Sequence, residues 1–118
     1  MPHRIDFLVE WTIETGKTEA FKVLADQALQ LVIASEPTTT VYNWHFNDAM
    51  NMAYSLETFT EQAAMELHLK NVFTLLKQMG KISKATRFEI FGDIDNVARE
   101  RLSGIGAKVF PYWKGNVR

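Results

Sequence analysis

Apolar and polar residues alternate along four stretches of the chain, namely residues 5–13, 39–47, 51–58 and 84–92. A period of two is typical of β-strands whose two faces meet different surroundings. Residues 47–50 lie between the second and third stretches and predict a tight turn, so these two stretches form a β-hairpin. The pattern therefore predicts four strands, of which the middle two are joined directly.

Two longer segments repeat their apolar residues at helical spacing instead. The first begins near Gly16 and stops before Pro37, because a proline biases the preceding residue out of the helical region. The second follows a capping box from Thr58 to Glu61 and ends at Gly80. The residues predicted to face the core from this second helix are Ala64, Leu67, His68, Val72, Phe73, Leu76 and Met79.

The last part of the chain adds a short helix and a short strand. Asp93 or Asp95 caps the helix, and residues 108–113 form an extended piece at a sheet edge. We expect a single domain over residues 1–118, with 93–118 as a C-terminal helix and edge-strand extension. The order of elements predicts an α+β fold of the ferredoxin-like, split βαβ type, with an antiparallel sheet and both long helices on one face.

Such a sheet leaves its second face uncovered. In the first strand, the apolar face is formed by Ile5, Phe7, Val9, Trp11 and Ile13. The other face carries Asp6, Leu8, Glu10 and Thr12. For the hairpin, two orientations are possible. Either its aromatic side packs against the helices, or its polar side, which includes His45, does so. Aromatic residues make up 12% of the chain, so we expect some to stay uncovered by the helices. A second copy covers such a patch with a single self-complementary surface, and we therefore expect a homodimer.

Composition excludes several classes of function. The net charge is −1, so no nucleic-acid or membrane partner is expected. The chain has no cysteine, which rules out disulfides and thiolate sites. Its N-terminus lacks the apolar core of a signal peptide, and no window has the roughly 20 apolar residues of a membrane span, so we expect a cytoplasmic location. The three histidines have no metal-binding spacing, and we expect neither a metal nor another cofactor.

A family resemblance appears at the hairpin and the second helix. Residues 36–39, Glu-Pro-Thr-Thr, and 42–44, Tyr-Asn-Trp, resemble the Glu-Pro-Gly-Thr and Tyr-Glu-Trp runs of antibiotic biosynthesis monooxygenase (ABM)-like domains. Residues 57–60, followed by Ala63, Ala64, His68 and Leu69, are similar to the segment Glu-x-Tyr-x-Asp, Ala, His-Leu of that family. Residues 106–110 resemble its closing strand. The resemblance covers most of the chain from Gly16 onward.

The resemblance implies a dimeric α+β barrel in which two ferredoxin-like sheets meet face to face. A cavity then lies between each sheet and its helices, or at the dimer seam. Family activities include cofactor-independent oxygenation of phenols and quinols and, in one branch, haem degradation. That branch needs an iron-binding histidine further along the second helix, where this chain has Leu75, Leu76 and Lys77. Haem degradation is therefore disfavoured.

Cofactor-free oxygenation requires a base that converts the substrate into an electron-rich anion. Histidine suits this task because its ordinary pKa lies near neutrality. His68 matches the histidine of the family, and His45 lies in a strand between two aromatic residues. Glu57 matches a family carboxylate and is expected to orient one of these rings. Each residue also has a purely structural interpretation: a packed His68, an exposed His45 and an exposed Glu57 at a strand end.

Aromatic residues complete the candidate site. Trp11, Trp44, Tyr54 and Phe73 are predicted to form the walls against a flat substrate, although aromatic residues at these spacings are also typical of a hydrophobic core. The sequence thus predicts a cofactor-independent monooxygenase acting on a small aromatic or quinol-type substrate. The alternative is a non-catalytic domain of the same fold that binds a small ligand or regulates a partner.

Overall fold

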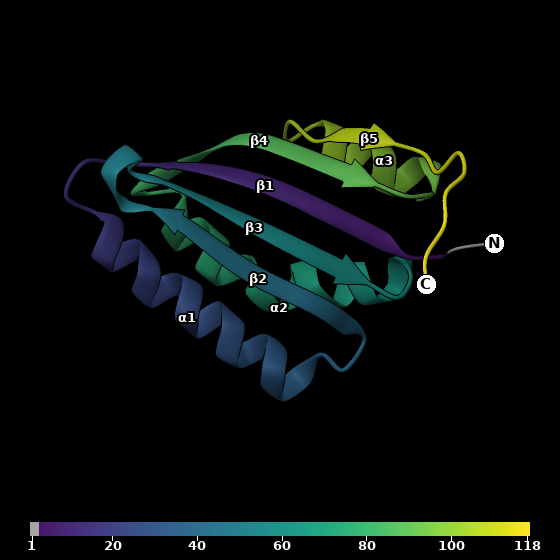
Figure 1. Ribbon diagram of the computed structural model, residues 1–118, viewed down its shortest axis with the longest axis horizontal. Coiled ribbons are helices and arrows are strands. Elements are labelled where there is room, and N and C mark those ends of the chain that lie inside the picture. Colours follow the sequence, from purple (N-terminus) through teal and green to yellow (C-terminus); the bar gives the residue numbers. More distant parts are fainter. Residues whose placement is uncertain (1–2) are drawn as a thin grey trace.

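A computed structural model describes residues 3–118 as one sheet with three helices (Figure 1). In chain order, the elements are β1 (Ile5–Ile13), α1 (Thr18–Ser35), β2 (Thr39–Asn47), a short 3₁₀ helix (Asp48–Met50), β3 (Met52–Phe59), α2 (Gln62–Met79), β4 (Ser83–Phe91), α3 (Asn96–Ser103) and β5 (Lys108–Phe110). None of the helices in the described chain is both long and apolar enough to span a membrane.

The five strands follow the order β2-β3-β1-β4-β5 across the sheet. The pairs β2–β3, β1–β3 and β1–β4 are antiparallel, whereas β5 joins the edge of β4 in parallel. The first strand of the sequence therefore lies at the centre of the sheet. The predicted α+β class, with a mostly antiparallel sheet and both long helices on one face, is confirmed.

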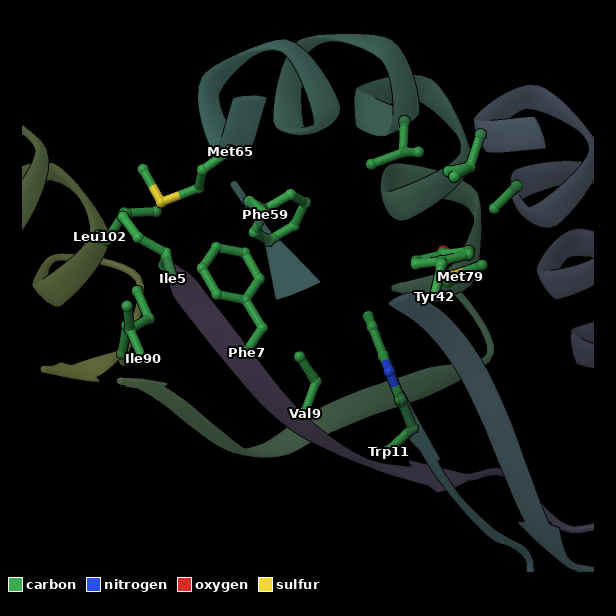
Figure 2. Close-up of a cluster of buried hydrophobic side chains, with 14 of the residues drawn as sticks. Ile5, Phe7, Val9, Trp11, Tyr42, Phe59, Met65, Met79, Ile90 and Leu102 are labelled. Carbon is green, nitrogen blue, oxygen red and sulfur yellow. The ribbon is translucent and has the colours of Figure 1, made fainter. Parts of the chain in front are cut away.

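The helices cover the face formed by the apolar side chains of β1. Figure 2 shows Ile5, Phe7, Val9 and Trp11 rising from this strand toward α2. The short helix α3 adds Leu102, which lies beside Met65 of α2 at the Ile5 end. Buried residues of the long helices are Phe21, Ala25, Ala28 and Val32 in α1, and Ala64, Met65, His68, Val72 and Met79 in α2.

Several predicted boundaries are wrong. The capping box is absent, because α2 starts at Gln62 and Glu61 occupies the N-cap without a side-chain hydrogen bond. The last strand ends at Phe110 instead of residue 113. On α2, Leu67 and Phe73 lie on the solvent side, and Phe73 is 60% exposed. The apolar spacing did not predict Met65 as a core residue, although Met65 is fully buried.

A β-bulge changes the predicted faces of β4. Between Glu10 and Trp11 the register of β1 moves from Arg87 to Ala85, so Thr86 is an extra residue on β4. A bulge reverses the side-chain alternation beyond it. Ala85 therefore lies on the helix side with Phe88, not on the opposite side as its position in the strand had predicted.

The uncovered face of the sheet combines polar pairs with apolar side chains. Tyr54 donates a hydrogen bond to Glu10, and Thr86 donates to the same carboxylate over 2.7 Å. The large apolar residues exposed on this face include Val41, Leu56, Phe91 and Phe110, which are between 37% and 46% exposed. The two phenylalanines are stacked with their ring centroids 5.5 Å apart.

Candidate active site

A buried histidine between two buried carboxylates forms the centre of the candidate site. His68 lies on the sheet-facing side of α2 and is 2% exposed. Its Nδ1 is 2.8 Å from Oε1 of Glu36, and its Nε2 is 3.0 Å from Oε1 of Glu57. The ring also packs against Tyr42 and Phe59, with centroids 5.1 and 5.2 Å away. Three titratable groups thus share one hydrogen-bonded chain in the protein interior.

Glu36 is placed by the end of α1. Pro37 ends the helix, and Glu36 adopts a non-helical conformation with φ −129° and ψ 74°. Its carboxylate accepts hydrogen bonds from the Thr39 hydroxyl over 2.8 Å and from the Asn71 amide over 3.0 Å. With His68, three donors therefore surround this fully buried carboxylate. Such an arrangement places a proton on His68 Nδ1, between the ring and the carboxylate.

Glu57 comes from the middle of β3, where it is flanked by Tyr42 on β2 and Phe7 on β1. Its Oε2 accepts a hydrogen bond of 2.8 Å from the buried Ser55 hydroxyl. The strand alternation brings Ser55 and Glu57 to the helix-covered face, two residues apart. Each carboxylate oxygen has two lone pairs, so Glu57 retains acceptor capacity beyond its bonds to Ser55 and His68.

The two carboxylates control the protonation of His68. Burial alone lowers the pKa of this imidazole, but the hydrogen bonds and charges of Glu57 and Glu36 outweigh it, and the pKa is raised. His68 is therefore a buried imidazolium over a wider pH range than a free histidine. The neighbouring Tyr42 stays neutral, because burial and the Glu57 charge raise the pKa of its phenol far above the ordinary value.

A cavity of about 280 Å³ opens beside this cluster, between the sheet and α2. Glu57, Ser55, His68 and Tyr42 form its polar end. Most of the remaining wall is apolar and consists of Phe7, Val9, Trp11, Trp44, Leu69, Leu76, Ala85, Phe88 and Ile105, together with Gly80. Phe7, Val9 and Trp11 can be followed along one strand in Figure 2. The cavity can therefore hold a small molecule with its reacting proton next to Glu57.

Trp11 contributes an unusual donor to this wall. Its side chain is 7% exposed, and its Nε1 has no hydrogen-bond partner among residues 3–118. The Nε1 of Trp44 is also buried without a partner in the described chain. An unmet buried donor costs about 1–3 kcal/mol, so an acceptor that reached the Trp11 indole from the cavity would remove this cost. Trp44 is also close enough to the Tyr42 hydroxyl to influence the pKa of that phenol.

The structure separates the predicted site residues into two groups. His68, Glu57, Trp11 and Trp44 surround the cavity. His45 is exposed and pairs with Tyr54 on the uncovered face of the sheet, so neither residue reaches the cavity. Phe73 lines a different cavity, with Glu66 and Arg101. No group of three or more metal-binding side chains is arranged as a metal site within residues 3–118.

Three contributors were missed by sequence reasoning. Glu36 was noticed only as the residue before a proline and as part of a family-like run, although a carboxylate at a helix end next to Pro37 was an available signal. Tyr42 belongs to an aromatic face and to the family-like run 42–44, but neither pattern predicts contact with His68. Ser55 carried no signal beyond its position two residues before Glu57 in the same strand.

Comparison with known proteins identifies the fold. No family model and no curated protein matches the sequence. Among solved structures, MupZ from Pseudomonas fluorescens is similar with a TM-score of 0.84 and 19% identity over 98% of this chain and 95% of that protein. A candidate antibiotic biosynthesis monooxygenase from Caulobacter crescentus matches with a TM-score of 0.70 and 16% identity over 80% of this chain and 92% of that one.

A third structure, a candidate antibiotic biosynthesis monooxygenase from Nitrosomonas europaea, gives a TM-score of 0.68 and 18% identity over 81% of this chain and 95% of that one. The chain therefore has the α+β fold of ABM structures, as the resemblance of its motifs implied. MupZ matches nearly the whole chain, including most of its C-terminal extension. At these identities the likeness describes the fold, and the activity has to be argued from the site.

Proposed function

We propose that this protein is a cofactor-independent monooxygenase acting on a small aromatic or quinol-type substrate. The observation that carries the proposal is the chain Glu36–His68–Glu57, which ends at an apolar cavity. Both nitrogens of His68 are engaged with carboxylates, whereas Glu57 keeps free lone pairs beside the cavity. Glu57 is thus the group that takes the substrate proton, and His68 and Glu36 position it and balance its charge.

This assignment changes the expected roles within the same set of residues. The sequence suggested a histidine base oriented by Glu57. The geometry favours Glu57 as the base and His68 as the positioning residue. Removal of a phenolic proton gives an anion that passes one electron to dioxygen. The resulting radical and superoxide combine at a ring carbon, the peroxide takes the proton back from Glu57, and loss of water, which takes one oxygen atom of dioxygen and the hydrogen of that carbon, leaves a quinone. The apolar wall keeps bulk water from the reacting atoms. Trp11 and Trp44 contact the flat ring of the substrate, whereas Tyr54, Phe73 and His45 have no part in this cavity.

Oxygen uptake with a panel of hydroquinones tests the proposal. We expect uptake by the wild type and a loss of at least about 100-fold in Glu57→Gln and His68→Asn, since general base catalysis typically contributes that much. His45→Ala is the matched control and should keep the wild-type rate. Absence of uptake with every hydroquinone, or unchanged uptake in Glu57→Gln, would contradict the proposal.

The second candidate is a non-catalytic domain that binds a small ligand in the same cavity. It is favoured by the complete internal pairing of Glu36, whose three donors all come from the protein. Such a network also serves to rigidify a binding site. Stoichiometric binding of a hydroquinone with full recovery of the unchanged compound under air would select this function over oxygenation.

The functional unit in this proposal is a homodimer formed through the uncovered face of the sheet. Four large apolar residues are exposed there, and Leu56 lies near the centre of that face, on a strand next to β1. A second copy shields such a patch with the same residues.

A further inference from the structure

The two ends of the cavity carry opposite hydrogen-bonding chemistry. On β3 and β1, Glu57 pairs with Phe7, while Trp11 pairs with Ala53 four residues away. At about 3.3 Å per residue, the two positions are roughly 13 Å apart along the sheet. Glu57 accepts protons or hydrogen bonds, whereas an indole N–H can only donate. The cavity therefore has an acceptor end and a donor end, with apolar side chains between them.

The donor end lacks any acceptor of its own. Trp11 is flanked by Ala53 on β3 and by Ala85 on β4, and neither side chain has a polar atom. Figure 2 shows the Trp11 ring standing in the space below α2. The Trp44 ring lies 6.2 Å from it and also has a buried Nε1 without a partner in the described residues.

The acceptor end sets the charge that a ligand can carry. The cluster contains two carboxyl groups and one imidazole, so acidic groups outnumber basic groups in this part of the interior. The cavity wall contains no lysine or arginine. A second buried anion would lack a compensating charge, and its loss of hydration would not be repaid.

We infer that the cavity binds an uncharged, ring-sized molecule with a hydroxyl group at the Glu57 end and a carbonyl oxygen at the Trp11 end. The hydroxyl donates to the free lone pairs of Glu57, and the carbonyl accepts from the Trp11 indole. This assignment rests on the proposed role of the cavity as the substrate site, and it adds the orientation of the substrate and the chemistry of its far end.

A set of matched phenols tests this assignment by calorimetric titration of the wild type. The probe is 4-hydroxyacetophenone, which has both groups. Its three comparison compounds are 4-ethylphenol without the carbonyl, 4-methoxyacetophenone without the hydroxyl, and the anion 4-hydroxybenzoate. We expect the probe to bind roughly threefold to tenfold more tightly than either single-group compound, since one hydrogen bond contributes about that much. The anion should bind most weakly.

Variants assign the carbonyl to Trp11. In Trp11→Phe, the preference for 4-hydroxyacetophenone over 4-ethylphenol should fall to about one, while the preference over the methyl ether remains. Trp113→Phe is the matched control, because Trp113 is 82% exposed and should keep the wild-type ratios. In the wild type, binding of the probe should also move the Trp11 indole proton resonance downfield, a measurement that does not depend on the folding of a variant.

Three results would overturn the assignment. They are equal binding of the ketone and the alkylphenol, a carbonyl preference that survives in Trp11→Phe, and tightest binding of the anion. Failure of every compound to bind at millimolar concentration counts against it equally. Oxygen uptake separates this test from that of the proposed function. Selective binding without oxygen consumption rejects the proposed monooxygenase and supports the ligand assignment. Oxygen uptake together with equal binding of 4-hydroxyacetophenone and 4-ethylphenol supports the monooxygenase and rejects the ligand assignment.

Discussion

The two faces of the sheet carry similar chemical groups in opposite surroundings. On the uncovered face, Glu10 accepts hydrogen bonds from Tyr54 and Thr86, and these bonds lower the pKa of its carboxyl group. On the helix-covered face, Glu57 accepts from Ser55 and His68. The first carboxylate is half-buried at the open surface of the sheet, whereas the second is 7% exposed and lies beneath α2.

The difference decides what each cluster can do. In the single subunit, water screens the charge on the uncovered face and replaces any lost hydrogen bond, so this cluster contributes little to the stability of the subunit itself. Under α2 the side chains of Glu36, Glu57 and His68 are at most 7% exposed, so each charge needs a partner within the protein. Proton chemistry is therefore expected on one face only, although the sequence contains carboxylates and a histidine on both.

The largest expected effect comes from breaking the buried chain at its centre. His68→Ala leaves two buried carboxylates without their shared partner, and we expect a loss of about 3–5 kcal/mol in the free energy of unfolding. Urea denaturation monitored by circular dichroism measures this loss. A change below about 1 kcal/mol would mean that the cluster is hydrated, and the contrast between the faces would then disappear.

A charge on the uncovered face should break association while leaving the cavity intact. We expect Leu56→Arg to convert the dimer into monomers, because two like charges would face each other across the symmetric contact. Sedimentation velocity measures the change, and the wild type should sediment as a dimer at the same concentration. A wild-type monomer would show that this face is not an interface, whatever the variant does.

Stability should fall as the pH rises above neutrality. Below about pH 6.5, His68 is protonated in both the folded and the unfolded chain, so its full stabilising contribution is present. As the pH rises through its raised folded-state pKa, the folded chain holds the proton longer than the unfolded chain, and the free energy of unfolding decreases with pH. Denaturation midpoints between pH 6 and 9 measure this slope. His68→Gln should flatten it, and a slope of unchanged size in that variant would assign it to other groups.

The smallest effects are expected for the matching residues on the uncovered face. His45→Ala should change the free energy of unfolding by no more than about 0.5 kcal/mol, as is usual for exposed positions. Tyr54→Phe, which removes the hydrogen bond to Glu10, should leave the denaturation midpoint within experimental error. Either variant could instead lose stability at protein concentrations that favour the dimer but keep it as a monomer. That result would place the substituted side chain in the dimer interface.

The arrangement of the fold could be predicted because each strand of the sheet has one covered face. Alternation in β1 gave the correct apolar side, and the hairpin was found from its two adjacent alternating runs. The side of the sheet on which Ala85 lies was predicted wrongly, because one extra residue, Thr86, reverses the alternation in β4. The amino-acid sequence of β4 does not indicate this bulge. Local patterns thus predict which elements form, but not every shift in their pairing.

The site was predictable only in part for a related reason. His68 and Glu57 were found because each lies within a regular element and matches a family motif. Glu36 lies just after the last turn of α1, where neither helical nor strand periodicity predicts the direction of a side chain. Its role depends on how the end of α1 packs against α2. His45 and Tyr54 lie opposite each other on the adjacent strands β2 and β3. The aromatic side and the polar side of the hairpin were both compatible with packing against the helices, so the sequence alone did not decide which side faces them.

Ile105 has one further consequence for how such a protein can change over time. It borders the cavity although it is 70% exposed, and it belongs to the turn between α3 and β5, far in sequence from Glu36, Glu57 and His68. Because Ile105 is exposed, we expect its substitution to reshape the apolar wall without disturbing the packed interior. Selection on which compounds the cavity admits can therefore act at Ile105 separately from selection on the buried Glu36–His68–Glu57 chain.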